Sequence, residues 1–488
     1  MIEEGSLSLL HREAELQRPH VPRMDSGQVL GMSAVRDLAP DCEKDACASL
    51  LVSCVHGVAA IERYFSEIDR LNLASERPNP FLSAGFLRCY ALRSEYHRPG
   101  REERLYLIRE GSHLIGCAPL RLSQDKWGLA HAPFYLRTGR LQFLAPLDTE
   151  QPGILCAPED AERVSAALIR FICDDERGWD LLELTGQRPG SPLYRAALAA
   201  AGTRFQARTI EVEPYNEISI EWQTLAAYFQ SLAKKMRSNI SRQGRRLFAS
   251  GEPELLFADG AEAASSWFDA YCELDARSWK HGTGASIARH PRRVRFYREI
   301  AAGNAGLEPS FIGILHGGVL IAGLLLGSNE NASPERHGAW CLEMAYDQSL
   351  ASLGPGQLLL LLAVGLSIER GWQYLNFMQN FSYYKHRWAA EPIEVENVQL
   401  IRKFSGRNLL ALLGELKRKW GRKPVHGTGS AAAPEASESG EPAGEPLGQS
   451  TNQEAARVLA AAALGRTGKG IRRLARPDAR AYLPFDLG

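Results

Sequence analysis

The chain has 488 residues, 45% hydrophobic and 23% charged, which predicts a soluble globular protein of roughly three domains at about 150 residues each. Its 57 basic and 57 acidic residues cancel, so no whole-protein field draws the chain to nucleic acid or to an anionic membrane. The nine cysteines never form a Cys-x-x-Cys pair, which argues against a disulfide framework or a zinc site and favours a reducing compartment.

Targeting signals are not visible in the sequence. The first thirty residues carry charged side chains and lack the apolar stretch of a signal peptide. The longest apolar run, 358–368, is far shorter than the about 20 residues that cross a bilayer. We therefore expect a cytoplasmic protein without a membrane span.

In chain order, residues 1–50 mix charge, proline and glycine and predict a poorly ordered N-terminal extension. An N-terminal domain is expected over 51–209, from the periodicity of its apolar residues and from its turn residues. Its expected elements are helices at 51–68 and 81–90, a hairpin at 105–109 and 114–122, a strand at 141–145, a helix at 159–173 and a strand at 179–184.

A second domain is expected over 210–422, followed by a flexible linker at 423–452 that is rich in Gly, Ser, Ala, Pro and Glu. Residues 453–488 form a basic C-terminal tail with one expected helix at 453–464. The expected elements of the second domain are a helix from 221 to 247, a strand at 254–258, helices at 261–279 and 291–302, a hairpin at 310–315 and 319–326, a strand at 340–346, a helix after a turn at 352–356 and a strand at 374–378.

The two domains resemble one another. The hairpin at 105–117 parallels that at 311–323, and Glu176-Arg-Gly-Trp179 parallels Glu369-Arg-Gly-Trp372. Each Gly-Trp pair ends a helix and feeds a strand, because glycine accepts the left-handed cap. The shared order of hairpin, helix and strand predicts an internal duplication. Only the second copy continues into an aromatic and basic run, Tyr-Tyr-Lys-His-Arg-Trp, so we expect only that copy to be catalytic.

The second copy resembles the GNAT-fold acyltransferases, particularly the CelD-like branch found with cellulose and exopolysaccharide biosynthesis, which is similar to the Fem-type aminoacyltransferases. The resemblance covers about residues 210–405. The features that carry it are the basic segment 234–246, the hairpin at 311–326, Tyr346-Asp347, Gly354-Pro-Gly356 before a leucine-rich helix, and Tyr384-Lys385 with Trp388. It implies an α/β (α+β) fold of two tandem GNAT-like domains, the first degenerate, each a mixed, mostly antiparallel sheet flanked by helices.

The glycine turn is the expected cofactor site. Glycines let the backbone approach a pyrophosphate, and the N–H groups that open the following helix can hold it. The resemblance assigns acetyl-CoA or another acyl-CoA to this turn, with Leu353, Gly354, Gly356 and Gln357 as its binding residues. The turn lacks the Gln or Arg that precedes the glycines in well-studied GNAT enzymes. The alternative is that Gly-Pro-Gly is only a tight turn and binds no ligand.

Two residues are catalytic candidates. Tyr384 could protonate the leaving thiolate, because the phenol pKa of about 10 exceeds the thiol pKa of about 8.5. Its neighbour Tyr383 is an alternative, and so is a purely packing role on the sheet edge. Asp347 could orient the acceptor amine or act as a base through water, while the alternative is a carboxylate that caps a loop.

Four residues are expected to bind the acceptor: Asn376, Gln379, Lys385 and Trp388. The CelD-like branch often has an acidic residue where this chain has Asn376. Lys385 and Trp388 could instead belong to an exposed helix face. The basic segment 234–246 could grip an anionic polymer or simply be solvated. His281, His316 and His337 lie near loops, and none of them has a Cys, Asp or Glu at metal-ligand spacing, so no metal is expected.

The resemblance implies a bacterial N-acetyltransferase-like enzyme that moves an acyl group from acyl-CoA to the amine of a small molecule or glycan, in surface polysaccharide biosynthesis. Polysaccharide synthesis proteins are the expected partners, and DNA is not one. Two alternatives stay open. One is a Fem-like transferase that uses aminoacyl-tRNA, and the other is a non-catalytic GNAT scaffold of a polysaccharide synthesis complex.

Overall fold

The structure is a computed structural model that describes residues 50–91, 100–127, 136–144, 151–251, 253–378, 387–388, 390–403, 470–474 and 476–485. All of these residues lie in one compact unit, Asp45–Gly488. The expected linker at 423–452 and the expected helix at 453–464 lie outside the described residues, as do residues 1–49 of the expected extension.

Sheet A is built mainly from the first half of the chain. Its strand order is β1-β2-β3-β4-β6-β15-β7, with β5 beside β3. Neighbouring strands are antiparallel except β4 and β6, which run parallel. The strands are β1 (Leu50–His56), β2 (Arg101–Glu110), β3 (His113–Trp127), β4 (Leu136–Phe143), β5 (Leu155–Cys156), β6 (Leu181–Gln187), β7 (Phe205–Glu211) and β15 (Glu396–Arg402).

Sheet B is built mainly from the second half and has the order β14-β8-β13-β12-β11-β10-β9-β16. Its single parallel pair among the described strands is β12 and β13. The strands are β8 (Tyr215–Ser219), β9 (Pro253–Asp259), β10 (Glu308–His316), β11 (Val319–Ser328), β12 (Gly338–Tyr346), β13 (Tyr374–Asn376), β14 (Glu391–Ile393) and β16 (Ile471–Leu474).

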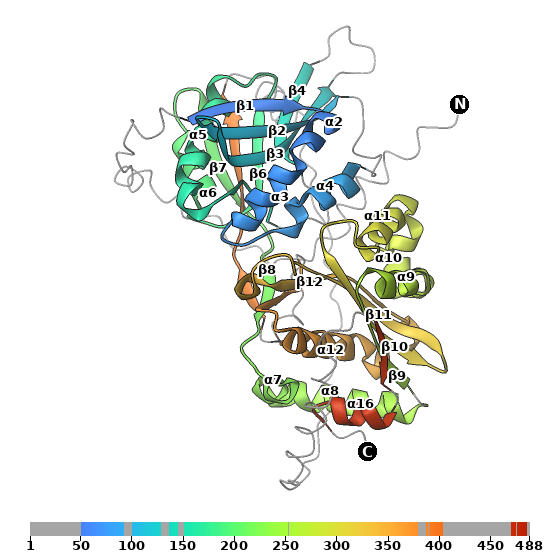
Figure 1. Cartoon of the computed structure of the whole chain (residues 1–488). Helices are drawn as coiled ribbons and strands as arrows, with labels where there is room; N and C mark the ends of the chain where they lie inside the picture. Colours follow the sequence, from blue (N-terminus) through green and yellow to red (C-terminus); the bar gives the residue numbers. More distant parts are fainter. Residues whose placement is uncertain are drawn as a thin grey trace, which may run out of the picture. The chain divides into compact units, whose positions relative to one another are not determined.

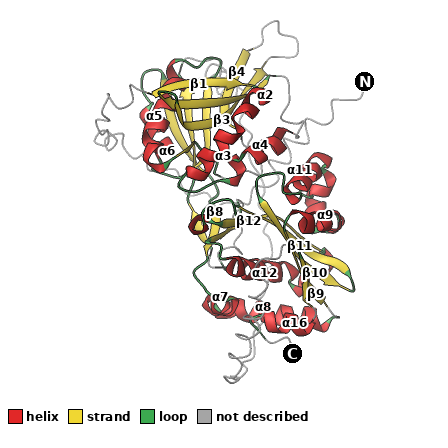
Figure 2. Cartoon of the chain, viewed as in Figure 1, coloured by secondary structure: helices red, strands yellow, loops and turns green. Residues whose placement is uncertain are grey.

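The two sheets follow the same plan. In each, an antiparallel run through a β-hairpin (β2–β3 or β10–β11) leads to one parallel pair (β4–β6 or β12–β13) and then to two more antiparallel strands. Figure 2 shows helices flanking these sheets. The expected fold class, two mixed and mostly antiparallel sheets flanked by helices, is confirmed.

The two halves exchange strands. The chain leaves sheet A through β7 and enters sheet B as β8, which lies between β13 and β14. It later leaves sheet B through β14 and returns to sheet A as β15, which lies between β6 and β7. The expected boundary at 209/210 therefore falls inside β7, and β15 belongs to the first sheet although it lies in the range 210–422.

Helices cover both faces of sheet B (Figure 1). Helices α7, α8, α12 and α16 enclose one core with apolar residues of the strands, and α9 and α11 enclose the core of the opposite face together with Phe81 and Phe86. The longer helices are α3 (Phe65–Ala74), α4 (Ala84–Ala91), α5 (Ala161–Asp174), α6 (Pro192–Ala199), α8 (Lys234–Ala249), α9 (Ala261–Asp275), α11 (Pro291–Ala301) and α12 (Pro355–Arg370), and the shorter ones are α2 (Val58–Ile61), α7 (Leu225–Ser231), α10 (Trp279–Thr283) and α16 (Arg476–Tyr482).

Two expected helices differ from the structure. Residues 50–56 form strand β1 and not the start of a helix, because this segment pairs along β2. Helical structure begins at Val58, after Gly57 with a φ of 82°. The expected helix from 221 to 247 is two helices, α7 and α8, separated at Leu232 and Ala233, whose extended backbones interrupt it. The first error arises because apolar spacing alone does not separate a short strand from a helical turn, and the second because that spacing continues across the break between α7 and α8.

The repeated Glu-Arg-Gly-Trp motif forms a glycine turn and a buried tryptophan in both halves. Gly178 has a φ of 83° and Gly371 a φ of 67°, values that suit glycine. Each turn is followed by a tryptophan, Trp179 or Trp372, that is almost fully buried. In both halves the motif thus anchors the chain in the core before the next strand begins. Gly371 also caps α12, as expected, whereas α5 ends at Asp174, before Gly178 is reached.

The described part of the C-terminal tail docks onto the second half. Strand β16 adds to sheet B at β9, and Tyr482 and Leu483 are buried in the core between α8, α12 and the sheet. Two glycines in the middle of helices make room for this segment. A Cβ on Gly365 of α12 would lie 2.7 Å from the Tyr482 hydroxyl, and one on Gly244 of α8 would lie 2.6 Å from the Phe485 ring.

Candidate functional site

The candidate site begins where β12 and β13 part. The two strands pair in parallel over Gly338–Trp340 and Tyr374–Asn376. Strand β12 then continues to Tyr346, whereas β13 ends at Asn376. A 3-10 turn, η7 (Gln348–Leu353), connects the end of β12 to α12. The first residues of α12 therefore stand next to the end of β12, beyond the point where the parallel pairing stops.

The structure brings the four predicted cofactor residues together at the start of α12. Gly354 adopts a left-handed conformation with a φ of 64°, and Pro355 occupies the first helical turn. The amide of Gln243, from α8, lies against the Cα of Gly354, where a Cβ would clash with it. Leu353 is half-buried against the core, so of the four it is the one with a clear packing role.

Polar amides from α8 flank this helix terminus. Asn239 donates a hydrogen bond to the Gln357 side chain at 3.3 Å and a second one to Gln243 at 3.4 Å. In the first turn of α12, Pro355 has no N–H and the Gln357 N–H bonds to the Gly354 carbonyl at 3.0 Å, so the N–H of Gly356 is the backbone donor that a phosphate oxygen would meet there. The Gln243 and Asn239 side chains are uncharged amides with N–H donors, so they could line such a phosphate site as neutral hydrogen-bond donors.

The structure gives Asp347 a capping role. Its carboxylate accepts hydrogen bonds from the backbone N–H and the hydroxyl of Ser349, at 2.9 and 2.6 Å, and lies 3.5 Å from the Arg277 guanidinium. The hydrogen bond from Ser349 lowers the pKa of Asp347 below its ordinary value. A carboxylate held ionised in this way is a weak base, so its geometry suits holding η7 better than taking a proton.

Asn376 redirects the chain after β13. It is 1% exposed, and its side-chain oxygen Oδ1 accepts a hydrogen bond from the backbone N–H of Met378 at 2.7 Å. Met378 has a φ of 61°, a backbone conformation that residues other than glycine seldom adopt. The Asn376 side chain therefore stabilises a sharp bend immediately before residues 379–386.

Three of the predicted site residues, Gln379, Tyr384 and Lys385, lie outside the described residues. Trp388, a predicted substrate contact, is 1% exposed and belongs to the core between the sheet and α7. Its carbonyl oxygen accepts a 2.8 Å hydrogen bond from the buried Tyr228 hydroxyl. The placement of Trp388 differs from the prediction, since a ring packed in the core cannot contact a substrate.

A cavity of about 580 Å³ adjoins Asn376. Its walls come from five separate segments of the chain, 75–82, 151–165, 186–193, 335–340 and 374–376. Arg77 lines the cavity, and its guanidinium pairs with Glu217 and lies 3.7 Å from the centre of the Tyr374 ring. Burial of its hydroxyl group raises the pKa of Tyr374 above the ordinary value.

The neighbouring strand β8 brings a carboxylate, that of Glu217, beside Asn376. Glu217 lies directly across from Asn376 on β13, and accepts a hydrogen bond from the Asn376 amide at 3.4 Å. The sequence could not indicate this, because Glu217 is 159 residues away and only the strand exchange brings β8 beside β13. Arg77 was missed for the same reason.

A second buried charge cluster lies on β12. Glu343 is 6% exposed and pairs with Lys280 of α10 and, at 2.8 Å, with Arg293 of α11. The carboxylate is thus neutralised by two cations from helices on one face of the sheet. No motif marked Glu343 in the sequence, where it stands within an apolar strand.

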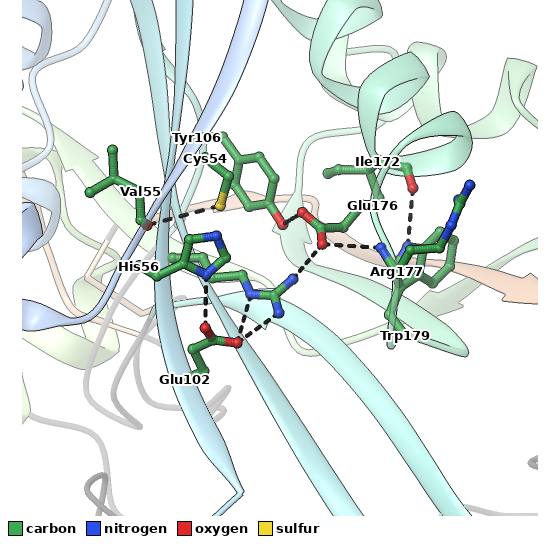
Figure 3. Close-up of polar contacts among 10 residues, drawn as sticks. Cys54, Val55, His56, Glu102, Tyr106, Ile172, Glu176, Arg177 and Trp179 are labelled. Carbon is green, nitrogen blue, oxygen red and sulfur yellow. Dashed lines mark hydrogen bonds and ion pairs between the residues drawn. The ribbon is translucent and has the colours of Figure 1, made fainter.

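The first half contains a polar network of its own (Figure 3). Arg104 lies between Glu102 and Glu176, the Tyr106 hydroxyl donates to Glu176 at 2.8 Å, and His56 contacts Glu102 at 2.8 Å. Glu176 belongs to the repeated Glu-Arg-Gly-Trp motif, so the network ties the end of α5 to sheet A. Burial raises the pKa of the nearby Cys54 thiol to about 12, which leaves it protonated and unreactive at neutral pH.

Within the described ranges, no group of three or more His, Cys, Asp or Glu side chains is arranged to hold a metal ion. None of the helices in the described part of the chain has both the length and the apolar character that crossing a bilayer requires.

Residues 234–386 match the family model for an acetyltransferase (GNAT) domain. A comparison with curated proteins found no match. Solved structures similar to this chain include a conserved protein of unknown function from Bacteroides thetaiotaomicron VPI-5482 (12% identity, 70% of this chain and 97% of that one, TM-score 0.44). FemX (12%, 74% and 99%, TM-score 0.38) and a tandem GNAT protein from the clavulanic acid biosynthesis pathway (12%, 72% and 98%, TM-score 0.38) are also similar. Residues 234–386, which hold α12 and most of sheet B, are thus the part of the chain that is similar to a GNAT acetyltransferase domain.

Proposed function

We propose that this protein transfers an acyl group from acyl-CoA to an amine acceptor. The observation that carries the proposal is the start of α12, where Gly354, Pro355 and Gly356 open a buried helix directly after β12, within the segment that matches the GNAT domain. Backbone N–H groups at a helix start are suited to the pyrophosphate of CoA. Leu353, Gly354, Gly356 and Gln357 are the proposed cofactor contacts.

The proposed chemistry is a direct transfer. The free amine attacks the thioester carbonyl, the carbon–sulfur bond breaks, and the thiolate leaves with the proton that Tyr384 gives it. The nitrogen loses one proton as it becomes an amide, and this proton returns through water to the Tyr384 phenolate. Asp347 would act indirectly, by holding the turn before α12. Asn376, Gln379 and Lys385 are the proposed acceptor contacts, and the cavity beside Asn376 offers room for a small molecule or a glycan amine.

We further propose a CelD-like role in bacterial surface polysaccharide biosynthesis, a cytoplasmic location, and polysaccharide synthesis proteins as partners. A Fem-like transfer from aminoacyl-tRNA is the second candidate, favoured by the exposed basic side chains of α8 near the start of α12. These are Lys234, Lys235, Arg242, Arg245 and Arg246.

The test is a panel of CoA thioesters added to the full chain, with thermal unfolding and product mass as the readouts. Binding to the folded state should raise the melting temperature in proportion to ligand concentration. Tyr384→Phe should keep this shift and lose turnover by about 100-fold or more, because it removes only the proton donor. Tyr383→Phe tests the alternative donor and should stay near the unsubstituted rate if Tyr384 gives the proton.

If no CoA thioester shifts the melting temperature, acyl-CoA dependence is excluded. Turnover that appears only with charged tRNA would favour the Fem-like alternative. A Tyr384→Phe variant with full turnover would remove Tyr384 from the mechanism and leave the cofactor proposal standing.

A further inference from the structure

The C-terminal segment, residues 470–474 and 476–485, packs against the two helices that form the candidate cofactor site. Its side chains join the core that α7, α8 and α12 build on sheet B. The centre of the Tyr482 ring lies 5.4 Å from that of Phe257 on β9, and the centre of the Phe485 ring lies 5.6 Å from that of Phe229 on α7. The segment thus shares one core with the helices on either side of the glycine turn.

Phe485 packs on the backbone of α8. Gly244 is a buried residue of this helix, and a Cβ at that position would lie 2.6 Å from the Phe485 ring. Glycine weakens a helix interior relative to alanine, so its presence here is explained by the approach of the ring. The position of α8 at this turn therefore depends on Phe485.

The same turn of α8 contacts the cofactor turn. Gln243 precedes Gly244, and its amide lies against the Cα of Gly354. Asn239, one turn earlier, donates to Gln243 at 3.4 Å and to Gln357 at 3.3 Å. Both hydrogen bonds are longer than the common range, so a shift of α8 by a few tenths of an ångström would break them. A displacement on the Phe485 side would thus reach the amides on the other side.

The segment also holds α12. A Cβ on Gly365 would lie 2.7 Å from the Tyr482 hydroxyl, which shows how closely the ring approaches this helix. Arg472 of β16 pairs at 3.0 Å with Glu369, in the last turn of α12. Because one short segment packs against both α8 and α12, it sets the spacing between the two helices.

We propose that the C-terminal segment positions the cofactor site, with Phe485 as the positioning residue. Its ring holds α8 where the amides of Asn239 and Gln243 can donate to a phosphate oxygen that meets the N–H of Gly356. The inference rests on the proposed function, because it takes the start of α12 as the cofactor site. Docking of the segment and binding of the cofactor are then coupled, so each strengthens the other.

The experiment compares acetyl-CoA binding to the full chain with and without the Phe485 ring, by calorimetry. Phe485→Ala should raise the Kd for acetyl-CoA about tenfold, because α8 relaxes into the space that the ring leaves. The kcat at saturating acetyl-CoA should change little, since Tyr384 and the acceptor contacts are unaltered. Phe485→Leu keeps most of the side-chain volume and should stay within about threefold of the unsubstituted Kd.

Phe171→Ala is the matched control. Phe171 is a partly buried phenylalanine of α5 that packs in the core of sheet A, against Tyr106. Its removal should lower the melting temperature, as Phe485→Ala also should, but leave the Kd for acetyl-CoA unchanged. In a chain that binds acetyl-CoA, an unchanged Kd in Phe485→Ala, or the same rise in both alanine variants, would overturn the proposal.

Hydrogen exchange of residues 348–358, measured without any ligand, separates this inference from the proposed function. Exchange there should be faster in Phe485→Ala than in the unsubstituted chain, and unaffected in Phe171→Ala, because only the first variant loosens α8. Faster exchange in a chain that binds no acetyl-CoA would count against the proposed function and leave the positioning role standing. Unchanged exchange would overturn the positioning role, whatever the binding data show.

Discussion

Glu343 shows how one residue can depend on segments that are distant in the sequence. Its carboxylate lies on β12, whereas its two cationic partners come from α10 and α11. A buried carboxylate is tolerated when it is paired, and breaking such a pair leaves uncompensated charge. Lys280 and Arg293 are themselves only 15% and 24% exposed on their side chains, so water would screen them poorly.

Glu343→Gln should therefore destabilise the protein by about 2–3 kcal/mol, because it leaves two cations facing each other without their common partner. The measurement is urea unfolding at neutral pH. Asp269→Asn is the control, since Asp269 and Arg298 form a pair that is 75% and 48% exposed and should contribute less than about 1 kcal/mol. Equal losses in the two variants would show that burial of Glu343 is not what matters.

At the scale of single residues, the sequence predicted some roles well and others not at all. Trp179 and Trp372 end up as anchors after their glycine turns, as the repeated motif indicated. Trp388 is also buried, which the prediction missed because its polar neighbours in the sequence give no sign that it packs against α7. Glu217 and Arg77 could not be found, since they pair with each other from segments that are distant in the sequence.

Among the elements, α12 contacts both the candidate cofactor site and the C-terminal tail. Its first turn faces Gln243 of α8, and its middle accommodates Tyr482 beside Gly365. Glycine inside a helix costs about 1 kcal/mol relative to alanine. The presence of Gly365 at this point is explained by the space that the Tyr482 hydroxyl needs.

Gly365→Ala should thus have opposite effects in two chains. In the full chain it should destabilise, since the new Cβ would lie 2.7 Å from the Tyr482 hydroxyl. In a chain that ends at residue 469 it should stabilise, by up to about 1 kcal/mol, because the helix gains a better former and the Tyr482 ring is gone. The Leu225 Cδ2 atom, 3.1 Å from the new Cβ, can then shift into the space that the ring leaves. Chemical unfolding of the four proteins gives both numbers. The same sign in both chains would mean that the tail does not set the requirement for glycine.

Element types followed from the sequence wherever a segment was long and periodic. Both hairpins, α5, α11 and α12 lie where apolar patterns predicted them. Strand β1 was missed because its seven residues carry an apolar pattern without clear alternation, and its identity comes from pairing with β2. The split between α7 and α8 is set by backbone conformations that the helix-favouring residues around Leu232 and Ala233 do not disclose.

In the whole molecule, the strand exchange couples the two halves. Sheet A needs β15 to connect β6 to β7, and sheet B needs β8 to connect β13 to β14. The sequence predicted a duplication but not the exchange, because no strand was expected at β7, β8, β14 or β15, and the sheet that each of them joins depends on pairing between distant segments. Separate domains at 51–209 and 210–422 were the simpler expectation.

We expect residues 50–403 to unfold in one cooperative step, since neither sheet can lose its exchanged strand without disrupting the other. Scanning calorimetry of the full chain should give a calorimetric enthalpy equal to the van't Hoff enthalpy. Two resolved transitions, each with its own enthalpy, would show that the halves are independent despite the shared strands.

The position of β15 also has a consequence for how the protein is made. Synthesis proceeds from the N-terminus, and domains generally fold as they emerge from the ribosome. Sheet A cannot do so, because the strand that joins β6 to β7 ends at Arg402. Until that residue has been translated, β6 and β7 each present an unpaired edge to the cell, so the first half must wait for almost the whole of the second before its sheet can close.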